Sequence, residues 1–310
     1  MDYDVLVIGA GAAGMTAAMY TCRKKLKTAI ISIDMGGQTN LTSHIENYPG
    51  TEPQSGYELM KAFKTNCEGL GCEFINGKVV KVEKLTEGFK VTLAHEVSYK
   101  AKTVIACFGK VPRSLGIPGE EKFTGRGVSS SVVSDGQKYK DKTVAIIGGG
   151  NSAFEGAIDL ADIAKNVYLV HRRKEFNADE VSVEKVKNLD NVEMILDAMP
   201  AAIKGKGHVT GIVVKQGEEE KELQVEGVFI EIGFLNDPAI IKNLVEVNDK
   251  KEIVINDRCE TKTPGLYCAG DATIVPFKQT VISAGEGAKA GLEAYCFITS
   301  GKGVTIDWTH

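Results

Sequence analysis

The stretch Val5-Leu6-Val7-Ile8-Gly9-Ala10-Gly11-Ala12-Ala13-Gly14 decides the fold of this chain. Its four apolar residues are typical of a buried parallel strand, and the glycines that follow have the spacing GxGxxG. Gly9, Gly11 and Gly14, with Ala12 between them, allow a tight turn and let backbone N–H groups approach a pyrophosphate at a helix N-terminus. The stretch therefore predicts a strand–turn–helix unit that binds a dinucleotide.

A second stretch of the same kind lies near the middle of the chain. Thr143-Val144-Ala145-Ile146-Ile147 runs into Gly148-Gly149-Gly150-Asn151-Ser152-Ala153. Here we expect the dinucleotide contacts to come from Gly148, Gly150, Asn151 and Ala153. One such motif is weak evidence, but two in one chain indicate two dinucleotides and electron transfer between them. The predicted fold class is α/β, with two Rossmann-like dinucleotide-binding domains.

Composition and charge narrow the class of protein. The 37 basic and 41 acidic residues leave a net charge of −4, which gives no electrostatic case for nucleic acid. No apolar run reaches the roughly 18–20 residues that span a bilayer, and the first strand begins too early to follow a signal peptide. The seven cysteines form no Cys-x-x-Cys and no zinc pattern with the five histidines. We expect a cytoplasmic protein with reduced thiols and no metal, membrane or nucleic-acid partner.

The remaining pattern places further elements and one acidic residue. We expect a helix over residues 14–24, a strand over 28–33, a small antiparallel insertion over 73–104, a hairpin tip at 218–222 and a last helix over 283–295. Asp34 ends the second strand, 20 residues after Gly14. A carboxylate at that distance can accept hydrogen bonds from an adenosine ribose.

Taken together, these residues resemble the low-molecular-weight thioredoxin reductases from end to end. The markers are the two glycine patterns and the stretches Gly36-Gly37-Gln38, Glu46-Asn47-Tyr48-Pro49-Gly50, His171-Arg172-Arg173, Thr263-Pro264-Gly265 and Ala269-Gly270-Asp271. The resemblance implies three-layer ββα domains, FAD and NADPH as cofactors, thioredoxin or a thioredoxin-like protein as partner, and a homodimer. It further implies FAD contacts at Gly37, Gln38, Asn47, Val80, Gly109, Gly270, Asp271, Lys278, Gln279 and Thr280.

The resemblance also implies a split domain. Linkers are expected at residues 111–119 and near 236–238, where prolines interrupt the pattern. We assign residues 1–114 and 245–310 to a discontinuous FAD domain and residues 115–244 to an inserted NAD(P)H-binding-like domain. The charges support placing FAD in the first domain and NADPH in the second, because Asp34 would repel the 2′-phosphate of NADPH. His171, Arg172 and Arg173 follow the corresponding strand of the second unit, where cations suit the extra phosphate of NADP.

The redox centre of the family is altered in this chain. The family carries a Cys-x-x-Cys just before the second glycine pattern, where this chain reads Ser129-Ser130-Ser131-Val132-Val133-Ser134-Asp135. Ser131 and Ser134 stand at the cysteine positions, and a hydroxyl forms no disulfide and is a poor nucleophile without an adjacent base. The resemblance makes Asp135 the proton donor and acceptor. Because both replacements are the closest isostere and Asp135 is kept, we favour a deliberate Cys-to-Ser pair over a natural flavoprotein without the thiols.

The electron donor is open as well. The NADPH signature of the family continues to a second arginine position, which is Asn177 here. Losing one charge-assisted contact costs about 1.5–3 kcal/mol, so NADPH is possible but weakened. A subgroup of the family takes electrons from reduced ferredoxin and shields its flavin with an aromatic tail. Trp308 and His310 suit that role, although a single aromatic packed elsewhere is an equal alternative.

The sequence thus predicts an FAD-dependent protein-disulfide reductase scaffold of the thioredoxin reductase type. Electrons would pass from NADPH or ferredoxin through FAD to a dithiol at positions 131 and 134, and on to thioredoxin. As written, the chain would be inactive in that reaction. The alternatives are a cysteine-free flavin oxidoreductase resembling a ferredoxin–NADP reductase, and a silent flavin-binding module.

Overall fold

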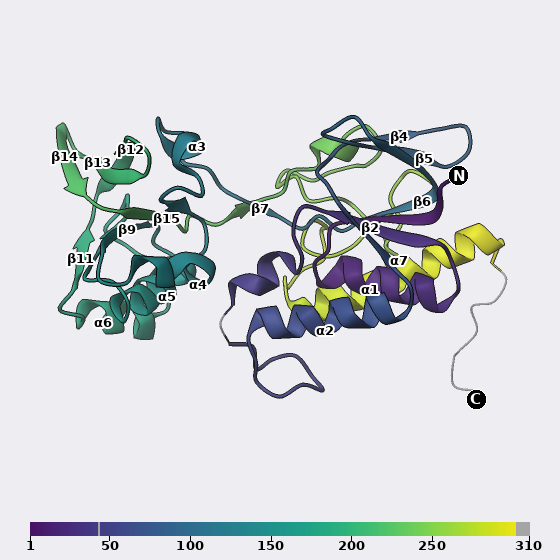
Figure 1. Cartoon of the computed structure of the whole chain (residues 1–310), viewed down its shortest axis with the longest axis horizontal. Coiled ribbons are helices and arrows are strands. Elements are labelled where there is room, and N and C mark those ends of the chain that lie inside the picture. The colour runs from purple at the N-terminus through teal and green to yellow at the C-terminus, as the bar shows by residue number, and fades with distance from the viewer. Residues whose placement is uncertain (43, 302–310) are drawn as a thin grey trace. The chain divides into compact units, whose positions relative to one another are not determined.

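The computed structural model describes residues 1–42 and 44–301, which form two compact units (Figure 1). Unit 1 comprises Met1–Val111 and the segment that begins at Asn236, and unit 2 comprises Pro112–Leu235. Each unit contains its own parallel sheet and its own buried core. The predicted α/β fold with two dinucleotide-type domains is confirmed. The first boundary follows Val111, 3 residues before the expected position 114. The second follows Leu235, 9 residues before the expected position 244.

Unit 1 is built on parallel strands whose apolar runs are buried on both faces, as such sheets require. The strands are β1 (Tyr3–Ile8), β2 (Thr28–Ser32), β3 (Glu73–Asn76), β6 (Ser98–Ala106) and β17 (Leu266–Cys268), in the order β3-β2-β1-β6-β17. Figure 1 shows one face of this sheet covered by α1 (Ala12–Arg23), α2 (Gly56–Gly69) and α7 (Thr280–Thr299). The carboxyl ends of the strands therefore meet at one edge, where the first glycine loop lies.

A small antiparallel meander forms the other layer of unit 1. It consists of β4 (Val79–Lys84), β5 (Phe89–Leu93) and the first residues of β6, which pair with β5 before the strand continues parallel to β1. We expected the whole of residues 73–104 to be antiparallel, and this was wrong for β3. Residues 73–76 pair in parallel with β2, because the strand returns to the sheet edge after α2 rather than after a hairpin turn.

Helices α1 and α7 pack so closely that their backbones come into contact. A Cβ atom at Gly287 of α7 would lie 2.1 Å from the carbonyl oxygen of Ala13 in α1. That separation is far inside van der Waals contact, so only glycine is compatible with this crossing. The contact joins the first and last helices of the described residues.

Unit 2 repeats the strand–turn–helix pattern. Its parallel sheet has the order β11-β10-β9-β15-β8, formed by β11 (Val192–Ile195), β10 (Asn166–Val170), β9 (Thr143–Ile147), β15 (Gly227–Ile230) and β8 (Val128–Ser129). Its helices are α3 (Glu120–Phe123), α4 (Val132–Asp135), α5 (Asn151–Ala161) and α6 (Glu180–Lys187). A separate antiparallel sheet contains β12 (Ala198–Gly205), β13 (Val209–Gln216) and β14 (Glu219–Gln224). Two short strands, β7 (Val111–Pro112) and β16 (Phe234–Leu235), pair with each other.

Two further expectations about elements need correction. Glu219 to Glu222 belong to β14 and pair with β13, so the hairpin tip lies earlier, at Gly217. An acidic run can form a strand when one of its faces stays in solvent, as it does here. The last helix is longer than predicted, since it runs over Thr280–Thr299 rather than residues 283–295.

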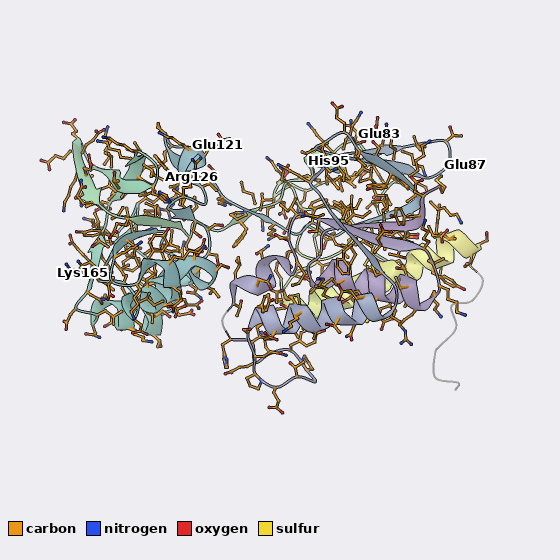
Figure 2. All side chains as sticks on the ribbon, in the orientation of Figure 1. Glu83, Glu87, His95, Glu121, Arg126 and Lys165 are labelled. Atoms are coloured by element: carbon orange, nitrogen blue, oxygen red, sulfur yellow. The ribbon has the colours of Figure 1, made fainter. Side chains whose placement is uncertain are left out.

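Charged side chains cover the outside of both units. Figure 2 shows Glu87 and His95 projecting from unit 1, and Arg126 and Lys165 projecting from unit 2. Within residues 1–42 and 44–301, no helix is both long and apolar enough to cross a membrane.

Candidate active site

The first glycine loop of unit 1 connects β1 to α1 by a very close turn. Gly9 has a φ of +102°, and its N–H donates to the carbonyl of Ile31 at 2.8 Å. A Cβ atom at Gly14 would lie 1.9 Å from the carbonyl oxygen of Gly9. By contrast, the nearest atom to a Cβ at Gly11 would be the Gly36 oxygen, 4.0 Å away. Gly9 and Gly14 close the turn, whereas Gly11 faces open space at the helix N-terminus.

Two other loops reach the same place. The N–H of Gly36 donates to the carbonyl of Ala10 at 2.7 Å, which holds the second loop against the first. The Gln38 amide nitrogen lies 3.5 Å from the carbonyl oxygen of Lys110. Added Cβ atoms at Gly37 and Gly109 would meet nothing closer than 3.7 Å and 3.9 Å. The backbone is therefore uncrowded at Gly11, Gly37 and Gly109, which belong to three neighbouring loops.

The N-terminal end of α7 contributes the polar side chains predicted from the resemblance. Ser283 donates to Asp271 Oδ1 at 3.0 Å, and the Asn47 amide donates to Gln279 Oε1 at 3.1 Å. The Thr39 and Thr280 hydroxyls lie 3.3 Å apart. Asn47, Thr39 and Asp271 are thus each joined to the N-terminal end of α7 by a separate hydrogen bond. The Lys278 ammonium donates to the carbonyl oxygens of Thr273 and Val275, the latter at 2.6 Å.

Glu286 is a functional-site neighbour that the sequence analysis missed. It is only 4 % exposed, and its Oε2 accepts hydrogen bonds from the Gly270 N–H at 2.7 Å and the Thr273 hydroxyl at 3.3 Å. Burial raises the pKa of Glu286, although these two bonds oppose the effect. The side chain fixes the loop that presents Asp271. Its only sequence signal is an acidic residue among small and apolar residues on the buried face of a helix.

Three predicted contacts lie at the margin of this region or outside the described residues. Asp34 is exposed two residues past β2, and its N–H lies 3.4 Å from the Ser32 hydroxyl. Val80, on β4, is 44 % exposed. The chain comes close to β2 just before β4, since the Gly77 N–H donates to the Ser32 carbonyl at 3.0 Å. His310 and Trp308 lie outside the described residues.

The residues of this region fit a dinucleotide. The uncrowded glycines leave room for a close approach. The N-terminus of α1 presents N–H groups that lack partners within the helix. Asn40 Oδ1 is buried and has no hydrogen-bond partner among the described residues. Such an acceptor is expected where a ligand completes the site. Asp271 adds a carboxylate for ligand hydroxyls.

The second glycine loop, in unit 2, is closed at one end and covered by a histidine ring. A Cβ at Gly148 would lie 2.3 Å from the carbonyl oxygen of Glu231 and 2.7 Å from Ala153 Cβ. A Cβ at Gly149 would overlap the His171 ring, whose nearest atom is 2.2 Å away. Nothing lies within 4 Å of a Cβ at Gly150, which starts α5. The open position corresponds to Gly11 of the first loop.

The segment after the basic triplet folds back over this loop. The Asn177 N–H donates to the Gly149 carbonyl at 2.8 Å. Two hydrogen bonds join Asn151 and Asp179. The Asn151 amide donates to the Asp179 carboxylate at 2.9 Å, and the Asp179 N–H donates to Asn151 Oδ1 at 2.8 Å. Arg172 and Arg173 are exposed and form no hydrogen bond or ion pair within the described residues. The predicted basic residues are therefore available to an anion near the loop.

The serine turn, defined here as Ser129–Asp135, runs from the last residue of β8 to the last residue of α4. Ser131 is 8 % exposed, and its hydroxyl donates to the Ser134 hydroxyl at 3.0 Å. Ser131 also caps α4, since its Oγ accepts from the Ser134 N–H at 3.1 Å. The two hydroxyls predicted to replace cysteines are therefore neighbours, one buried and one exposed.

Asp135 does not activate these hydroxyls. Its carboxylate accepts from the Ser129 hydroxyl at 2.6 Å and from the Lys138 ammonium. Burial alone would raise the pKa of Asp135, but these two bonds outweigh it and hold the pKa below its usual value of 3.8. Neither Ser131 nor Ser134 has a general base within hydrogen-bond reach among the described side chains. A nucleophilic role for either serine lacks its chemical requirement.

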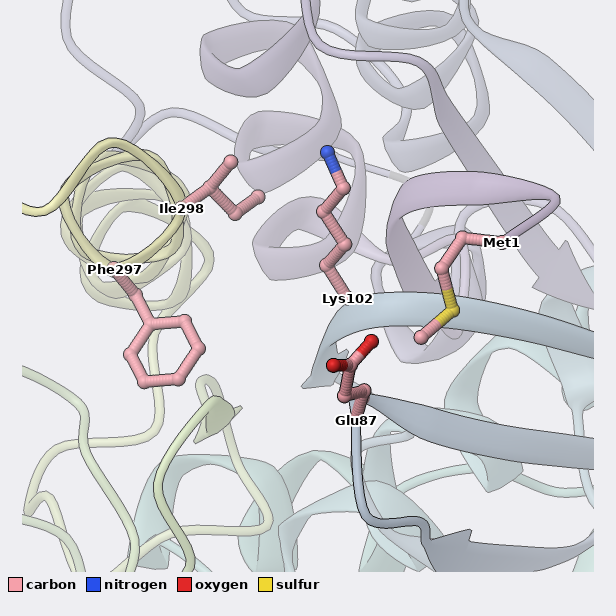
Figure 3. Close-up of a pocket in the computed structure, with 6 residues that line it drawn as sticks. Met1, Glu87, Lys102, Phe297 and Ile298 are labelled. Carbon is pink, nitrogen blue, oxygen red and sulfur yellow. The ribbon is translucent and has the colours of Figure 1, made fainter.

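One small cavity lies elsewhere in unit 1 (Figure 3). It measures about 290 Å³ and is lined by Met1, Glu87, Gly88, Lys102, Phe297 and Ile298. Met1 and Lys102 belong to the amino-terminal ends of the parallel part of the sheet, whereas ligands of such sheets bind at the carboxyl ends. The cavity is therefore separate from the glycine loops. Across residues 1–42 and 44–301, no three His, Cys, Asp or Glu side chains are grouped to hold a metal ion.

Comparisons with known proteins agree with this geometry. The F component of the alkyl hydroperoxide reductase of Pseudomonas aeruginosa is 40 % identical over 300 residues, which cover 94 % of this chain and 58 % of the relative. The chain thus spans less than two thirds of the length of the curated relatives that it matches.

Solved structures match over nearly their whole length. Thioredoxin reductase of Lactococcus lactis in its FR conformation is 35 % identical, with a TM-score of 0.83 and coverage of 96 % of this chain and 99 % of that one. The T. acidophilum thioredoxin reductase is 33 % identical, with the same coverage and a TM-score of 0.80. The family model described as pyridine nucleotide-disulphide oxidoreductase matches residues 3–289. The chain belongs to the pyridine nucleotide-disulphide oxidoreductase family.

Proposed function

We propose that this chain is an FAD-dependent oxidoreductase of the thioredoxin reductase type whose dithiol positions carry serine. The observation that supports it most directly is the serine turn, because Ser131 and Ser134 place two hydroxyls 3.0 Å apart where the family has its redox pair. The similarity to solved thioredoxin reductases, which extends over 96 % of the chain, supports the same assignment.

In this proposal unit 1 binds FAD. Gly11, Gly37 and Gly109 would face its pyrophosphate and flavin, and Asp271 would accept hydrogen bonds from its hydroxyls. Bound FAD would supply two-electron transfer between a donor and the dithiol positions. The protein orients it through the region tied together by Asn47 and Gln279. Residues 1–114 and 245–310 are the proposed FAD domain, and residues 115–244 the domain that carries the turn.

With sulfur at 131 and 134, the turn would perform thiol–disulfide exchange. The thiolate attacks one sulfur of the partner disulfide, and the second thiol then displaces the reduced partner as the intramolecular disulfide forms. Two electrons leave the protein in each cycle. The partner would be thioredoxin or a thioredoxin-like protein. Since the curated relatives are named as one subunit of an alkyl hydroperoxide reductase, another protein of such a system is a second candidate. A homodimer and a cytoplasmic location stay predictions.

Restoring both thiols is the test of this function. The FAD-loaded Ser131→Cys/Ser134→Cys variant is photoreduced without oxygen and mixed with oxidised thioredoxin, so that no natural donor is needed. We expect the flavin to be reoxidised and two thioredoxin thiols to form for each flavin that is reoxidised. The single variants Ser131→Cys and Ser134→Cys are matched controls, because one thiol cannot close the internal disulfide. A reduced flavin that persists in the double variant would contradict the proposal.

Replacing Asn177 with arginine tests the donor. Its backbone bond to Gly149 can also form with arginine, so Asn177→Arg is expected to keep the fold. It adds a cation to the segment that follows Arg172 and Arg173. We expect the Kd for NADPH to fall about ten- to a hundredfold, the equivalent of about 1.5–3 kcal/mol. Calorimetric titration measures it, with NADH as the control. An equal gain for NADH would show that the new arginine does not recognise the 2′-phosphate.

A cysteine-free flavin oxidoreductase is the second candidate, favoured by the serines themselves. It predicts that the unaltered chain, loaded with FAD, is reduced rapidly by NADPH or by reduced ferredoxin and passes electrons to an acceptor other than a disulfide. A silent flavin-binding module would accept electrons from neither donor. Stopped-flow absorbance of the flavin distinguishes the two.

A further inference from the structure

The segment that carries the basic triplet is attached to the core of unit 2 at its start. We call residues 171–179 the basic loop. The His171 N–H donates to the Ile195 carbonyl at 3.0 Å, which continues the pairing of β10 with β11. Further along, the Phe176 ring packs edge-on against the fully buried Phe154 of α5, with ring centroids 4.9 Å apart. The first part of the basic loop is therefore held by the sheet and by α5.

The end of the basic loop is held by the Asn151–Asp179 pair. Asn151 is the first residue of α5, and its amide nitrogen donates to Asp179 Oδ2 at 2.9 Å. Its amide oxygen accepts from the Asp179 N–H at 2.8 Å. Both polar ends of the Asn151 side chain are thus engaged by one residue, which fixes the orientation of the amide. The bond from the Asn177 N–H to the Gly149 carbonyl joins the same two segments.

Asp179 forgoes a common role in order to form this pair. It directly precedes α6, in the position from which an aspartate usually accepts a hydrogen bond from the first turn of its helix. Among the described residues, its side chain makes no such bond. The carboxylate binds the Asn151 amide instead. The pair therefore joins the beginnings of two helices and closes the basic loop over the second glycine loop.

We propose that Asn151 and Asp179 are positioning residues, which hold the basic loop so that Arg172 and Arg173 meet the 2′-phosphate of NADPH. Both arginines are exposed and form no ion pair within the described residues. Ordering a loose loop on binding would reduce the affinity, and a loop that is already held avoids that cost. The glycine pattern predicts Asn151 as a direct dinucleotide contact, whereas this assignment gives its side chain to the loop. The inference rests on the proposed NADPH site and not on the disulfide chemistry.

Titration of Asn151→Ala with NADPH and with NADH distinguishes the two roles of Asn151. NADH lacks the 2′-phosphate and shares the rest of the molecule. If Asn151 positions the basic loop, the Kd for NADPH should rise about tenfold, and the Kd for NADH should change less than about twofold. Calorimetry measures both values. An equal loss for the two nucleotides overturns the proposal, because it is the result expected of a direct contact to their shared part.

Replacement of Asp179 tests the same pair from its other side. Asp179→Ala should also weaken NADPH binding selectively, although removing a negative charge would by itself strengthen the binding of an anion. Asp179→Asn keeps an oxygen for the Asn151 amide and should restore most of the affinity. In Asn151→Ala/Asp179→Ala the losses should not add, because a single pair is broken. Tighter NADPH binding by Asp179→Ala contradicts the positioning role.

Glu180→Ala is the matched control. Glu180 is an exposed acidic residue and the first residue of α6. Its replacement removes one negative charge beside Asp179 and leaves the Asn151–Asp179 pair in place. We expect no loss of affinity for NADPH in this variant. A loss as large as that of Asp179→Ala would show that the effect arises from the start of α6 and not from the pair.

Hydrogen exchange of the chain without nucleotide tests the contact itself. In Asn151→Ala, the Asn177 and Asp179 amides should exchange about tenfold faster than in the unaltered chain, because the end of the basic loop is released. The amides of β9 and β10 should exchange as before, which shows that unit 2 is still folded. NMR with 15N labelling measures these rates. Unchanged exchange at Asn177 refutes the proposal, since the loop would then be held without the pair.

The outcomes separate this inference from the proposed function. If the Ser131→Cys/Ser134→Cys variant does not reoxidise its flavin while Asn151→Ala loses NADPH selectively, the disulfide chemistry fails and the positioning role stands. If reoxidation is normal but the unaltered chain binds NADPH no better than NADH, the disulfide chemistry stands. The role of the basic loop in recognising the 2′-phosphate is then refuted.

Discussion

Gly14→Ala is expected to destabilise unit 1 by about 3 kcal/mol or more. Its Cβ would lie 1.9 Å from the Gly9 carbonyl oxygen and 3.0 Å from the Gly9 carbonyl carbon. The backbone of Gly9 cannot retreat, because its N–H is bonded to Ile31 and its φ of +102° is already unusual. Since β1 and α1 both lie at the centre of unit 1, the strain spreads through the sheet. Urea unfolding, followed by far-ultraviolet circular dichroism, measures the loss.

Gly11→Ala is the matched control for this prediction. The backbone at Gly11 is extended, with φ −81° and ψ −173°, and the nearest atom to the new Cβ lies 4.0 Å away. We expect its free energy of unfolding to change by no more than about 0.5 kcal/mol. If the first glycine loop binds FAD, the added methyl group should weaken retention of FAD without affecting the fold. Equal stability of Gly14→Ala and the unaltered chain would refute the steric argument.

Glu286→Ala is expected to cost about 3–5 kcal/mol of stability. It removes an acceptor that is 4 % exposed and leaves the Gly270 N–H and the Thr273 hydroxyl without their partner. Each orphaned donor costs about 1–3 kcal/mol, and the cavity adds to this. Glu286→Gln keeps one acceptor oxygen and should cost far less. Glu293→Ala, on the same helix, removes a half-buried carboxylate that pairs with the exposed Arg258, and it should cost only about 1 kcal/mol.

Glu286 also predicts a direction of pH dependence. Burial raises its pKa above the usual 4.5 in the folded chain. The folded state therefore keeps the proton longer than the unfolded state, and the contribution of this group to stability falls as pH rises from 4.5 through the raised pKa. Urea midpoints between about pH 4.5 and 8 should decline less steeply in Glu286→Gln than in the unaltered chain. A steeper decline in the variant would contradict this sign.

Sequence patterns predicted those parts of the fold that depend on neighbouring residues. The apolar run before Gly9 and the glycine spacing after it determine β1, the turn and α1 together, since each follows from local sterics and burial. The same holds for the second loop at Gly148. Residues 73–76 were placed in the wrong kind of pairing because the partner strand, β2, lies far away in sequence. Local alternation indicates a strand but does not identify its neighbour.

The residues of the candidate site also divide into those that a local sequence pattern reveals and those that depend on contacts between distant segments. The glycines and Asp271 were found because their spacing carries the signal, and the structure ties Asp271 to Ser283. Glu286 was missed, since an acidic residue in a sequence is normally exposed. Its burial arises only because distant segments pack together, α7 against the Gly270 loop. Which acids are buried is therefore a property of tertiary structure.

The backbone contact between Gly287 and Ala13 has a consequence for how the chain is made. The core of unit 1 requires its last helix, which packs on the first, so it cannot be complete until residue 299 has left the ribosome. Residues 112–235, in contrast, are contiguous and are synthesised earlier. Domains generally fold as units during synthesis. The inserted domain is thus expected to mature first on the ribosome, while the amino-terminal strands wait for the carboxyl-terminal helix.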